Sequence, residues 1–341
     1  CLGAIARSRQ LIVVGDSKQL PPTSFFDRVG EGDPDQEQDE TAIDDMESIL
    51  DICESIYHPS HSLRWHYRSE HEDLIRFSNY HFYDQNLILL PSSRNQSDEL
   101  GVRYHYLSEG RFAKGVNVEE AAAVARAVVS HFETSPHVSL GVGAFNQAQR
   151  EVIRDQIELL LNEKPELWPL YESSQQGAEP FFVKNLENIQ GDERDVIFVS
   201  CTYGPDPETG KVFQRFGPIN SAMGWRRLNV IFTRAKRRLE LFTSMTSEEI
   251  IADDSSSRGV RMFKQYLKYA ETKEIHDLGQ LTTRGPDSDF ERAVGKVITQ
   301  FGYEYEANLG VSPFFLDIAV RHPNRRDSFI LGVECDGAAY H

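Results

Sequence analysis

The sequence predicts an α/β protein built on a mostly parallel sheet, followed by a smaller α/β segment. Strand-like runs alternate with helical segments between about residues 63 and 245, at 102–107, 138–145, 195–200 and 239–244. Three polar pairs have N-cap and capping-box spacing, which predicts helices near 70–82, 118–133 and 147–162: Ser69 with Glu72, Asn117 with Glu120, and Asn146 with Gln149. LIVV at 11–14 is typical of a buried strand. Alternating strands and helices indicate a parallel sheet covered by helices.

The C-terminal part has its own pattern, which begins near Pro286. A predicted helix places one apolar face at helical spacing, formed by Phe290, Val294, Val297, Ile298 and Phe301. Two strand-like runs follow, at 314–320 and 329–336. The polar stretch at 246–285 is predicted to be a helical linker, and the acidic stretch at 29–40 a solvated loop.

Composition excludes several classes of protein. At roughly 150 residues per domain, 341 residues predict two to three domains. No apolar run approaches the roughly 20 residues needed to span a bilayer, which excludes a membrane protein. The four cysteines lie far apart without a CxxC pair, so we expect no disulfide framework, no zinc site and a cytoplasmic location. The net charge of −17 does not exclude a nucleic-acid partner, because residues 31–54 alone hold eleven Asp and Glu and no Lys or Arg.

Five segments carry the chemistry of the predicted parallel sheet. GDSKQLPP at 15–22 would place Asp16 and Gln19 at the carboxyl end of a strand, where parallel sheets bind ligands, although a plain turn is the alternative. The others are LRWHYRS at 63–69, GVGAFNQAQRE at 141–151, NLENIQGDERDVIFVS at 185–200 and RRLNVIFTRAKRR at 226–238. In this order the segments resemble the late motifs of superfamily 1 helicases, in the branch of the nonsense-mediated-decay RNA helicase and related 5′-to-3′ DNA helicases. The resemblance covers about residues 10–245.

The resemblance implies an ATP site between two RecA-like domains. Arg68 and Arg234 would be the cations that stabilise charge at the γ-phosphate, although a surface salt bridge is the alternative for either arginine alone. Gln19 would sense the γ-phosphate and its attacking water, with Asp16 supporting that loop. The remaining family positions would lie by the ribose (Gly191 and Glu193) and by the nucleic-acid strand (Asn146, Asn185 and Gln190).

The chain departs from the family pattern in three ways. Many relatives have Pro-Tyr where this chain has Phe145-Asn146. Many also have a Ser or Thr in place of Asn185 and an Asp in place of Glu187. These differences leave open the direction of movement and the choice between DNA and RNA. No GxxxxGK[ST] phosphate loop occurs in the 341 residues, and no DE-type magnesium motif precedes the strand predicted at 11–14. We therefore expect both motifs to lie upstream of Cys1, and the chain to be a fragment that does not hydrolyse ATP alone.

Three carboxylates in the C-terminal part suggest a metal site. Glu334 and Asp336 would share one face of a strand, and Asp317 would lie mid-strand, where a carboxylate is costly unless it is paired or binds a metal. Such oxygen ligands suit Mg²⁺ or Mn²⁺, which would activate water for phosphodiester cleavage. The segment at 286–341 resembles the start of the restriction-endonuclease-like fold in its very-short-patch-repair-like form. Asp336 stands where many members carry lysine, so the general base is unassigned and an inactive docking domain remains an alternative.

These observations predict the following organisation: the end of a first RecA-like motor domain at 1–28, an acidic loop and linking helix at 29–62, a second RecA-like domain at 63–246, a helical linker at 247–285 and a partial nuclease domain at 286–341. The predicted function is that of an ATP- and Mg²⁺-dependent helicase with an appended nuclease. Its track would be nucleic acid, with single-stranded DNA favoured over RNA. A non-catalytic nucleic-acid-binding scaffold and an active helicase with an inactive nuclease-like domain are the alternatives. The oligomeric state is left open.

Overall fold

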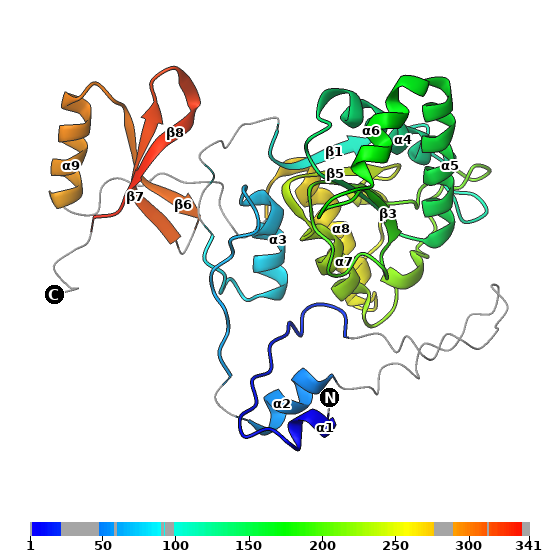
Figure 1. Cartoon of the computed structure of the whole chain (residues 1–341), viewed down its shortest axis with the longest axis horizontal. Coiled ribbons are helices and arrows are strands. Elements are labelled where there is room, and N and C mark those ends of the chain that lie inside the picture. Colours follow the sequence, from blue (N-terminus) through cyan, green and yellow to red (C-terminus); the bar gives the residue numbers. More distant parts are fainter. Residues whose placement is uncertain are drawn as a thin grey trace. The chain divides into compact units, whose positions relative to one another are not determined.

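The computed structural model describes residues 2–21, 48–57, 60–89, 92, 99–275, 289–311 and 314–335. The chain divides into two units, Cys1–Leu63 and Arg64–His341, and each is described by itself. The second unit holds a parallel sheet and a separate antiparallel sheet (Figure 1). The α/β fold class predicted from the sequence is thereby confirmed.

The first unit contains two short helices, α1 (Leu2–Ile5) and α2 (Ile49–Ile56). Ser48 caps α2 in a capping box with Asp51. The buried strand predicted at 11–14 is wrong: these residues pair with no strand among the described residues, and Ile12 and Val14 are 77% and 81% exposed. A parallel strand is stable only beside other strands, and the described part of this unit provides none.

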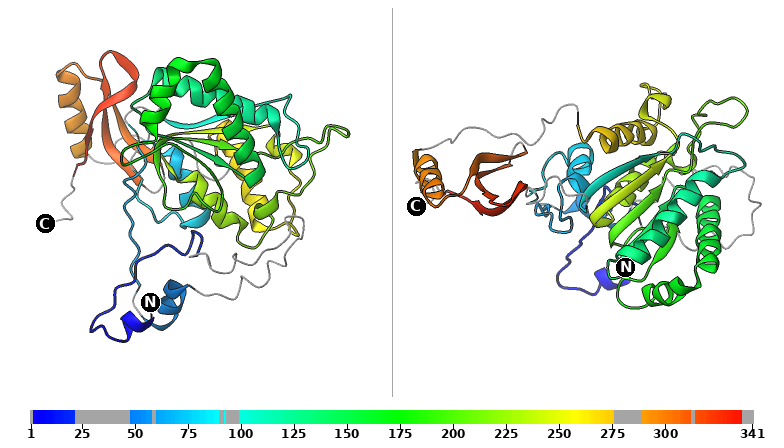
Figure 2. Two further views of the ribbon diagram at one scale, coloured as in Figure 1. Left: turned by 45° about the vertical axis from the view of Figure 1, so that its right-hand side comes forward. Right: turned by 90° about the horizontal axis from the view of Figure 1, so that it is seen from above.

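The parallel sheet has five strands in the order β1-β5-β4-β2-β3. The strands are β1 (Gly101–Tyr106), β2 (Leu140–Ala144), β3 (Phe182–Asn185), β4 (Arg194–Ser200) and β5 (Ala235–Thr243). Helices α4 (Val118–Thr134) and α5 (Gln147–Glu163) cover one face, and α7 (Gly224–Phe232) and α8 (Arg258–Thr272) cover the other (Figure 2). Helices α3 (Asp73–Phe82) and α6 (Trp168–Ser174) complete this layer arrangement. Burial on both faces is the usual state of an all-parallel sheet.

Two of the three predicted helix starts are confirmed. The Asn117 side chain accepts from the Glu120 backbone N–H at the start of α4, and Asn146 accepts from that of Gln149 at the start of α5. In a full capping box the Glu120 side chain would also accept from the Asn117 N–H. Here the Asn117 N–H instead donates to the Gln149 Oε1 atom of the neighbouring helix α5, at 2.8 Å.

The third predicted helix start is wrong. Helix α3 begins at Asp73 with Glu72 as an N-cap that makes no side-chain hydrogen bond. The Ser69 hydroxyl instead lies 2.8 Å from the His66 Nε2 atom, so it stabilises the turn before the helix rather than the helix itself.

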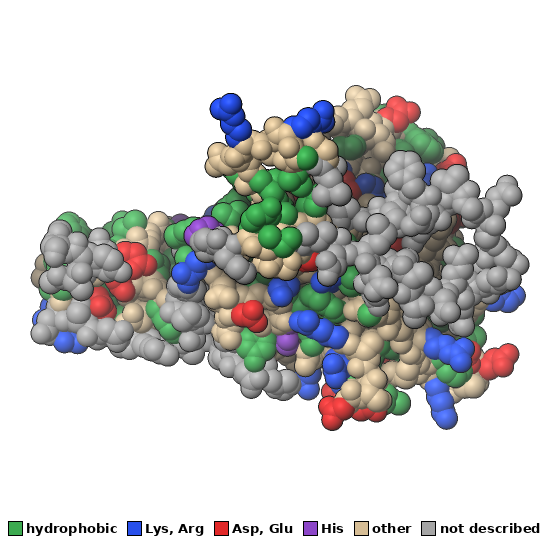
Figure 3. All heavy atoms as spheres, turned by 90° about the horizontal axis from the view of Figure 1, so that it is seen from below, with side chains coloured by type: hydrophobic (Ala, Val, Ile, Leu, Met, Phe, Trp, Pro, Cys, Tyr) green, Lys and Arg blue, Asp and Glu red, His purple; other side chains and the backbone are tan. Residues whose placement is uncertain are grey.

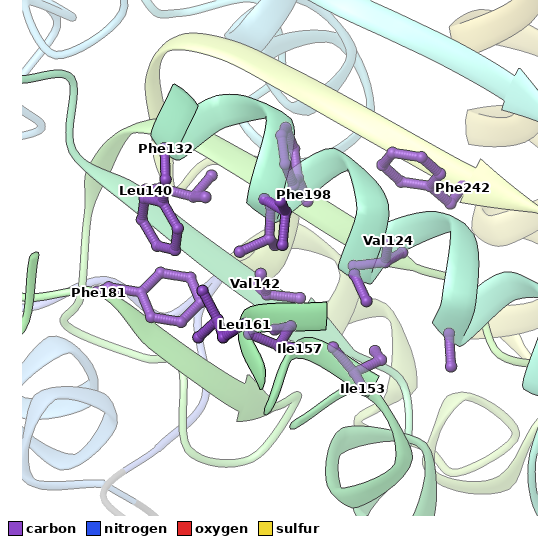
Figure 4. Close-up of a cluster of buried hydrophobic side chains, with 14 of the residues drawn as sticks. Val124, Phe132, Leu140, Val142, Ile153, Ile157, Leu161, Phe181, Phe198 and Phe242 are labelled. Atoms are coloured by element: carbon purple, nitrogen blue, oxygen red, sulfur yellow. The ribbon is translucent and has the colours of Figure 1, made fainter. Parts of the chain in front are cut away.

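One core of the parallel-sheet domain lies between the strands and helices α4 and α5 (Figure 4). Its side chains alternate along each strand, so Val196 and Phe198 of β4 point into it. Phe132 of α4 packs edge-on against Phe181, just before β3. The sequence did not indicate β3, which has four residues and includes Lys184, too short and too polar to stand out.

Helix α8 lies in the stretch predicted to be a helical linker, and it packs on the opposite face of the parallel sheet. Phe263, Tyr266 and Tyr269 are almost fully buried along one side of it, and the Tyr266 ring stacks on Phe232 of α7. The Tyr269 hydroxyl donates to the Asp73 carbonyl oxygen at 2.7 Å. The helix therefore contributes to the core despite its polar average composition.

The C-terminal part has a three-stranded antiparallel sheet, β6 (Tyr305–Val311), β7 (Phe314–His322) and β8 (Arg325–Val333), and a helix, α9 (Asp289–Gln300). The predicted apolar helix face is only partly buried: Phe290, Val297 and Phe301 are 58%, 48% and 75% exposed. Gly295 lies against the sheet instead, where a Cβ atom would come within 2.3 Å of the Tyr305 ring. Helix α9 therefore approaches the antiparallel sheet closely at Gly295, which is not one of the predicted apolar residues.

Candidate functional site

The loops at the amino ends of β4 and β5 gather several predicted ATP-site residues. The Glu70 N–H donates to the Lys236 carbonyl oxygen at 2.7 Å, which fixes the segment before α3 to the start of β5. The Arg68 Nε atom consequently lies 2.7 Å from the Glu193 carboxylate, just before β4. The Lys236 Nζ atom lies 3.9 Å from the other Glu193 oxygen and also pairs with Glu179. The folded chain thus brings Arg68 and Glu193 together from positions far apart in the sequence.

Arg68 keeps an exposed charge in this cluster. About 34% of its side chain is exposed, so its guanidinium is accessible to an anion from solvent. The neighbouring residue His66 is held neutral, because burial, with a smaller effect of the Arg68 charge, lowers the pKa of its imidazole from 6.5 to about 4. The positive charges beside Glu193 therefore come from Arg68 and Lys236, and the neutral His66 adds none.

Arg234, the second predicted finger, lies differently. Its side chain is buried, with 3% of the residue exposed. The guanidinium donates to the Val230 carbonyl oxygen at 2.8 Å and to the Thr233 hydroxyl at 3.2 Å, at the carboxyl end of α7. Cations are favourable at that end of a helix. The Arg234 backbone is close to the cluster, since its carbonyl oxygen accepts from the Arg194 N–H at 3.2 Å.

The loop before β4 also contains Gln190 and Gly191. Gly191 has a φ of 87°, the left-handed region that favours glycine, and a Cβ atom there would contact nothing within 4 Å. Gln190 is exposed in the same loop. The turn therefore has open space beside Gly191.

Asp16 and Gln19 lie in the first unit and form one turn. The Gln19 amide donates to the Asp16 carboxylate at 2.8 Å, and the Lys18 N–H donates to the other carboxylate oxygen at 2.9 Å. Asp16 thus supports the Gln19 side chain, as the resemblance implies.

The other predicted nucleic-acid residues lie at the carboxyl ends of β2 and β3. Asn185 pairs in register with Ala144, which places it beside the Asn146 loop. The Asn146 side chain is used structurally, because it caps α5 and its amide donates to the Gly115 carbonyl oxygen at 2.9 Å. Asn185 is buried, and its Oδ1 atom has no hydrogen-bond partner among the described residues. An acceptor left without a partner is costly, so Asn185 is the better candidate for a ligand contact.

Sequence reasoning missed a buried carboxylate at the same edge. Glu120 is fully buried; one oxygen accepts from the Ser200 hydroxyl and the Thr202 N–H, both at 2.6 Å, and the other from the Ser244 hydroxyl at 3.1 Å. Burial raises the pKa of Glu120 from 4.5 to about 7. The capping-box spacing drew attention to Glu120, but its partners lie at the ends of β4 and β5, which spacing does not reveal.

Glu120 and His66 should give opposite pH dependences of stability. The folded state binds the Glu120 proton more tightly, so that contribution is complete below pH 4.5 and is lost as pH rises through about 7. The folded state binds the His66 proton less tightly, so that contribution is complete above pH 6.5 and is lost as pH falls through about 4. Between pH 4.5 and 6.5 the two slopes, each about 1.4 kcal/mol per pH unit, oppose one another.

Urea unfolding at several pH values checks this expectation. Relative to wild type, the unfolding free energy of Glu120→Gln should rise with pH across this window, and that of His66→Gln should fall. Difference curves that do not change with pH would show that neither group titrates abnormally. Glu119→Gln, a change at a more exposed carboxylate beside Glu120 in the same helix, is the control and should leave the slope unchanged.

Among the predicted C-terminal metal ligands, the Asp317 carboxylate lies next to the backbone that follows β8. The Asp317 Oδ2 atom accepts from the Cys335 N–H at 2.6 Å, and the other oxygen makes no hydrogen bond to a described residue. Strand β8 ends at Val333, so the prediction that Glu334 lies within the strand is wrong: it follows the strand and is exposed. Asp336 lies outside the described residues. Within the described ranges no three metal-binding side chains converge.

One face of the molecule shows basic and acidic side chains together rather than a patch of one charge (Figure 3). On the face in Figure 3, basic and acidic side chains are interspersed among the described residues. No helix in the described part of the chain is long and apolar enough to cross a membrane.

Comparison with known proteins finds a family match in each of two parts of the chain. The AAA-domain family matches residues 46–246, and the family described as REase_MTES_1575 matches residues 290–341. An uncharacterized ATP-dependent helicase of Mycoplasma genitalium (MG140) is 34% identical over 269 residues, 78% of this chain and 24% of the relative. Its Mycoplasma pneumoniae homologue is 31% identical over 304 residues, 88% of this chain and 26% of the relative.

The chain thus spans about a quarter of the length of these relatives. A solved structure, the C-terminal domain of a possible DNA helicase from Lactobacillus plantarum, aligns with 15% identity and a TM-score of 0.30 over 59% of this chain and 96% of that one. The family match covers more than half of the chain and agrees with the five-stranded parallel sheet. The chain therefore belongs to the AAA-domain family of superfamily 1-type helicases, and it carries a restriction-endonuclease-like segment at its C-terminal end.

Proposed function

We propose that this chain supplies the second-domain half of an ATP-dependent motor that moves along nucleic acid. The arrangement of Arg68, Glu193 and Lys236 at the amino ends of β4 and β5 carries the proposal. A partly exposed arginine, held by a carboxylate and backed by a lysine, is suited to meet the γ-phosphate of a nucleotide bound to a facing domain. An arginine finger of this kind stabilises the charge that develops during phosphoryl transfer.

The other ATP-site residues have distinct roles in this proposal. Glu193 and Gly191 would lie by the ribose, and Gln19, supported by Asp16, would sense the γ-phosphate. Arg234 would act as the second cation at the end of α7. ATP binding also needs a phosphate loop, which the 341 residues do not contain, and its Mg²⁺ needs a DE-type motif, which does not occur ahead of residues 11–14. We therefore expect this chain alone not to turn over ATP.

The track would be single-stranded nucleic acid, with DNA favoured over RNA. Asn185, with its unpartnered buried oxygen, would face the strand at the carboxyl edge of the sheet. Gln190 would link that contact to Glu193, which stands three residues later in the same loop. Asn146 would act by holding the start of α5 in place.

ATP turnover by the full-length protein, with and without single-stranded DNA or RNA, tests the proposal. Stimulation by one of them would identify the motor and its track. No turnover with either, while nucleic acid still binds, would favour a non-catalytic scaffold that retains the motor fold. The 341-residue chain, tested beside it, is expected to show no turnover.

A second proposed activity is metal-dependent cleavage of nucleic acid by the C-terminal segment. Asp317 supports it, because one carboxylate oxygen anchors the chain beyond β8 and the other is available to a ligand. Asp317, Glu334 and Asp336 would provide the oxygen ligands that Mg²⁺ or Mn²⁺ prefers, and such an ion would activate a water molecule. Cleavage of labelled DNA and RNA by the full-length protein in each metal tests it. Unwinding without cleavage in either metal would favour an inactive nuclease-like domain.

A further inference from the structure

A short segment after β4 presents two cations and an aromatic ring on one side. Lys211, Phe213 and Arg215 are exposed, while Val212 and Gln214 between them are half-buried. Phe213 is 58% exposed, so its ring is accessible to a ligand. We call residues 211–215 the basic-aromatic strip.

The strip is held in place along its length. Val212 forms a bridge with Pro205, and the Lys211 carbonyl oxygen accepts from the Asp206 N–H at 2.9 Å. The Gln214 amide donates to the Val212 carbonyl oxygen at 2.9 Å and to that of Glu249 at 3.1 Å, and it accepts from the Ile251 N–H at 2.8 Å. The outward side chains therefore stand on an ordered backbone, which reduces the entropy lost on binding a ligand.

The two cations of the strip are available. Neither Lys211 nor Arg215 forms an ion pair with a described residue. Asp206 and Glu208 are the acidic residues of the adjoining turn. The Asp206 carboxylate is occupied locally, since it accepts from the Glu208 and Thr209 N–H groups and from the Thr209 hydroxyl. The positive charge of the strip is therefore not neutralised by direct contact.

The strip continues from the edge where the proposed nucleic-acid residues lie. It follows Tyr203 and Pro205 at the carboxyl end of β4, in a loop that projects from the domain (Figure 2). The Tyr203 ring lies 6.5 Å, between ring centroids, from that of Phe145, the neighbour of Asn146. The Phe112 N–H, from the loop after β1, donates to the Pro205 carbonyl oxygen at 3.0 Å. The start of the strip is thereby tied to the Asn146 loop.

We propose that the basic-aromatic strip is an additional binding surface for single-stranded nucleic acid, on which a base stacks against Phe213 while Lys211 and Arg215 contact the phosphates on either side. Flat aromatic rings beside cations are the means by which proteins bind single strands without reading sequence. The proposal rests on the proposed function, because it extends the same track. An acidic peptide would match the cations but would leave the exposed ring without a flat partner.

Fluorescence anisotropy of the full-length protein with labelled oligothymidylate and oligouridylate tests the strip. Phe213→Ala should weaken binding by roughly tenfold, within the range for loss of one stacked base. Phe213→Leu keeps apolar area without a flat π face and should weaken binding similarly. The double variant Lys211→Ala with Arg215→Ala should reduce the slope of log affinity against log salt by about 1.4.

A matched control comes from α5, where the exposed side chains of Arg154 and Leu159 lie outside the strip. Arg154→Ala with Leu159→Ala should leave affinity and salt slope unchanged. If wild type binds the oligonucleotides and the strip variants bind equally well, the strip is wrong and the proposed function stands. If wild type binds neither oligonucleotide, both the proposed function and the strip are wrong.

Discussion

Replacement of Arg68 by alanine in the full-length protein is expected to reduce the turnover number for ATP by about 10³–10⁵-fold. The side chain is held by Glu193 at 2.7 Å yet remains about one-third exposed, so it is ordered and accessible at once. Its charge would be needed mainly in the transition state, so turnover should fall far more than ATP affinity. Steady-state kinetics, with nucleic-acid binding by anisotropy as a parallel readout, measure both effects.

Two further variants separate catalysis from general effects of charge. Arg237→Ala removes a nearby arginine of similar exposure, 30%, that pairs with Glu70 at 3.4 Å, and it should change turnover little. Arg68→Lys keeps the charge but loses the planar fork, so it should recover part of the activity. Near-normal turnover by Arg68→Ala would mean that Arg68 is only a surface ion pair with Glu193, and would shift the role to Arg234.

The features that the sequence predicted well are those set by local chemistry. Asn117 and Asn146 begin helices because a short side chain accepts from a backbone N–H three residues later, a spacing that predicted two of the three helix starts. Buried parallel strands such as β4 carry continuous apolar runs, so their positions are clear. The α/β class follows from the alternation of these two signals.

The features that it missed depend on partners distant in the chain. The LIVV run at 11–14 has the composition of a strand, but a strand also needs neighbours to pair with. The helix predicted at 247–285 was expected to be a linker because its average composition is polar, yet Tyr266 and Tyr269 of α8 are buried in the core. The buried Glu120 carboxylate depends on Ser200 and Ser244, which come from the ends of two other strands.

In the candidate site, too, some features followed from the sequence and others did not. Motif order predicted which residues would form it, and the fold brings Arg68 and Glu193 into contact, although they stand 125 positions apart. Motif order did not predict that Arg234 would be buried against its own helix, or that the Asn146 side chain would be used as a helix cap. Each of these results depends on local hydrogen-bond competition, which a list of motif positions does not contain.

Asp317→Asn in the full-length protein is expected to abolish metal-dependent cleavage of nucleic acid, with a loss of at least about 10²-fold, because a bound metal ion contributes several kcal/mol to such a reaction. Asparagine has the same size, and its side-chain oxygen can still accept from the Cys335 N–H, now 2.6 Å from the carboxylate. The local fold should therefore be retained while the negative charge that attracts the metal is lost. ATP turnover, which uses other residues, should be unchanged.

Calorimetric titration with Mn²⁺ provides a readout independent of cleavage, and Asp317→Asn should weaken that binding as well. Glu304→Gln, at an exposed carboxylate just before β6, is the matched control and should affect neither measurement. If Asp317→Asn cleaves and binds Mn²⁺ as wild type does, Asp317 serves only to anchor the chain after β8. The metal site would then have to be sought among other carboxylates, since the contact between Asp317 and Cys335 would be fully explained by the fold.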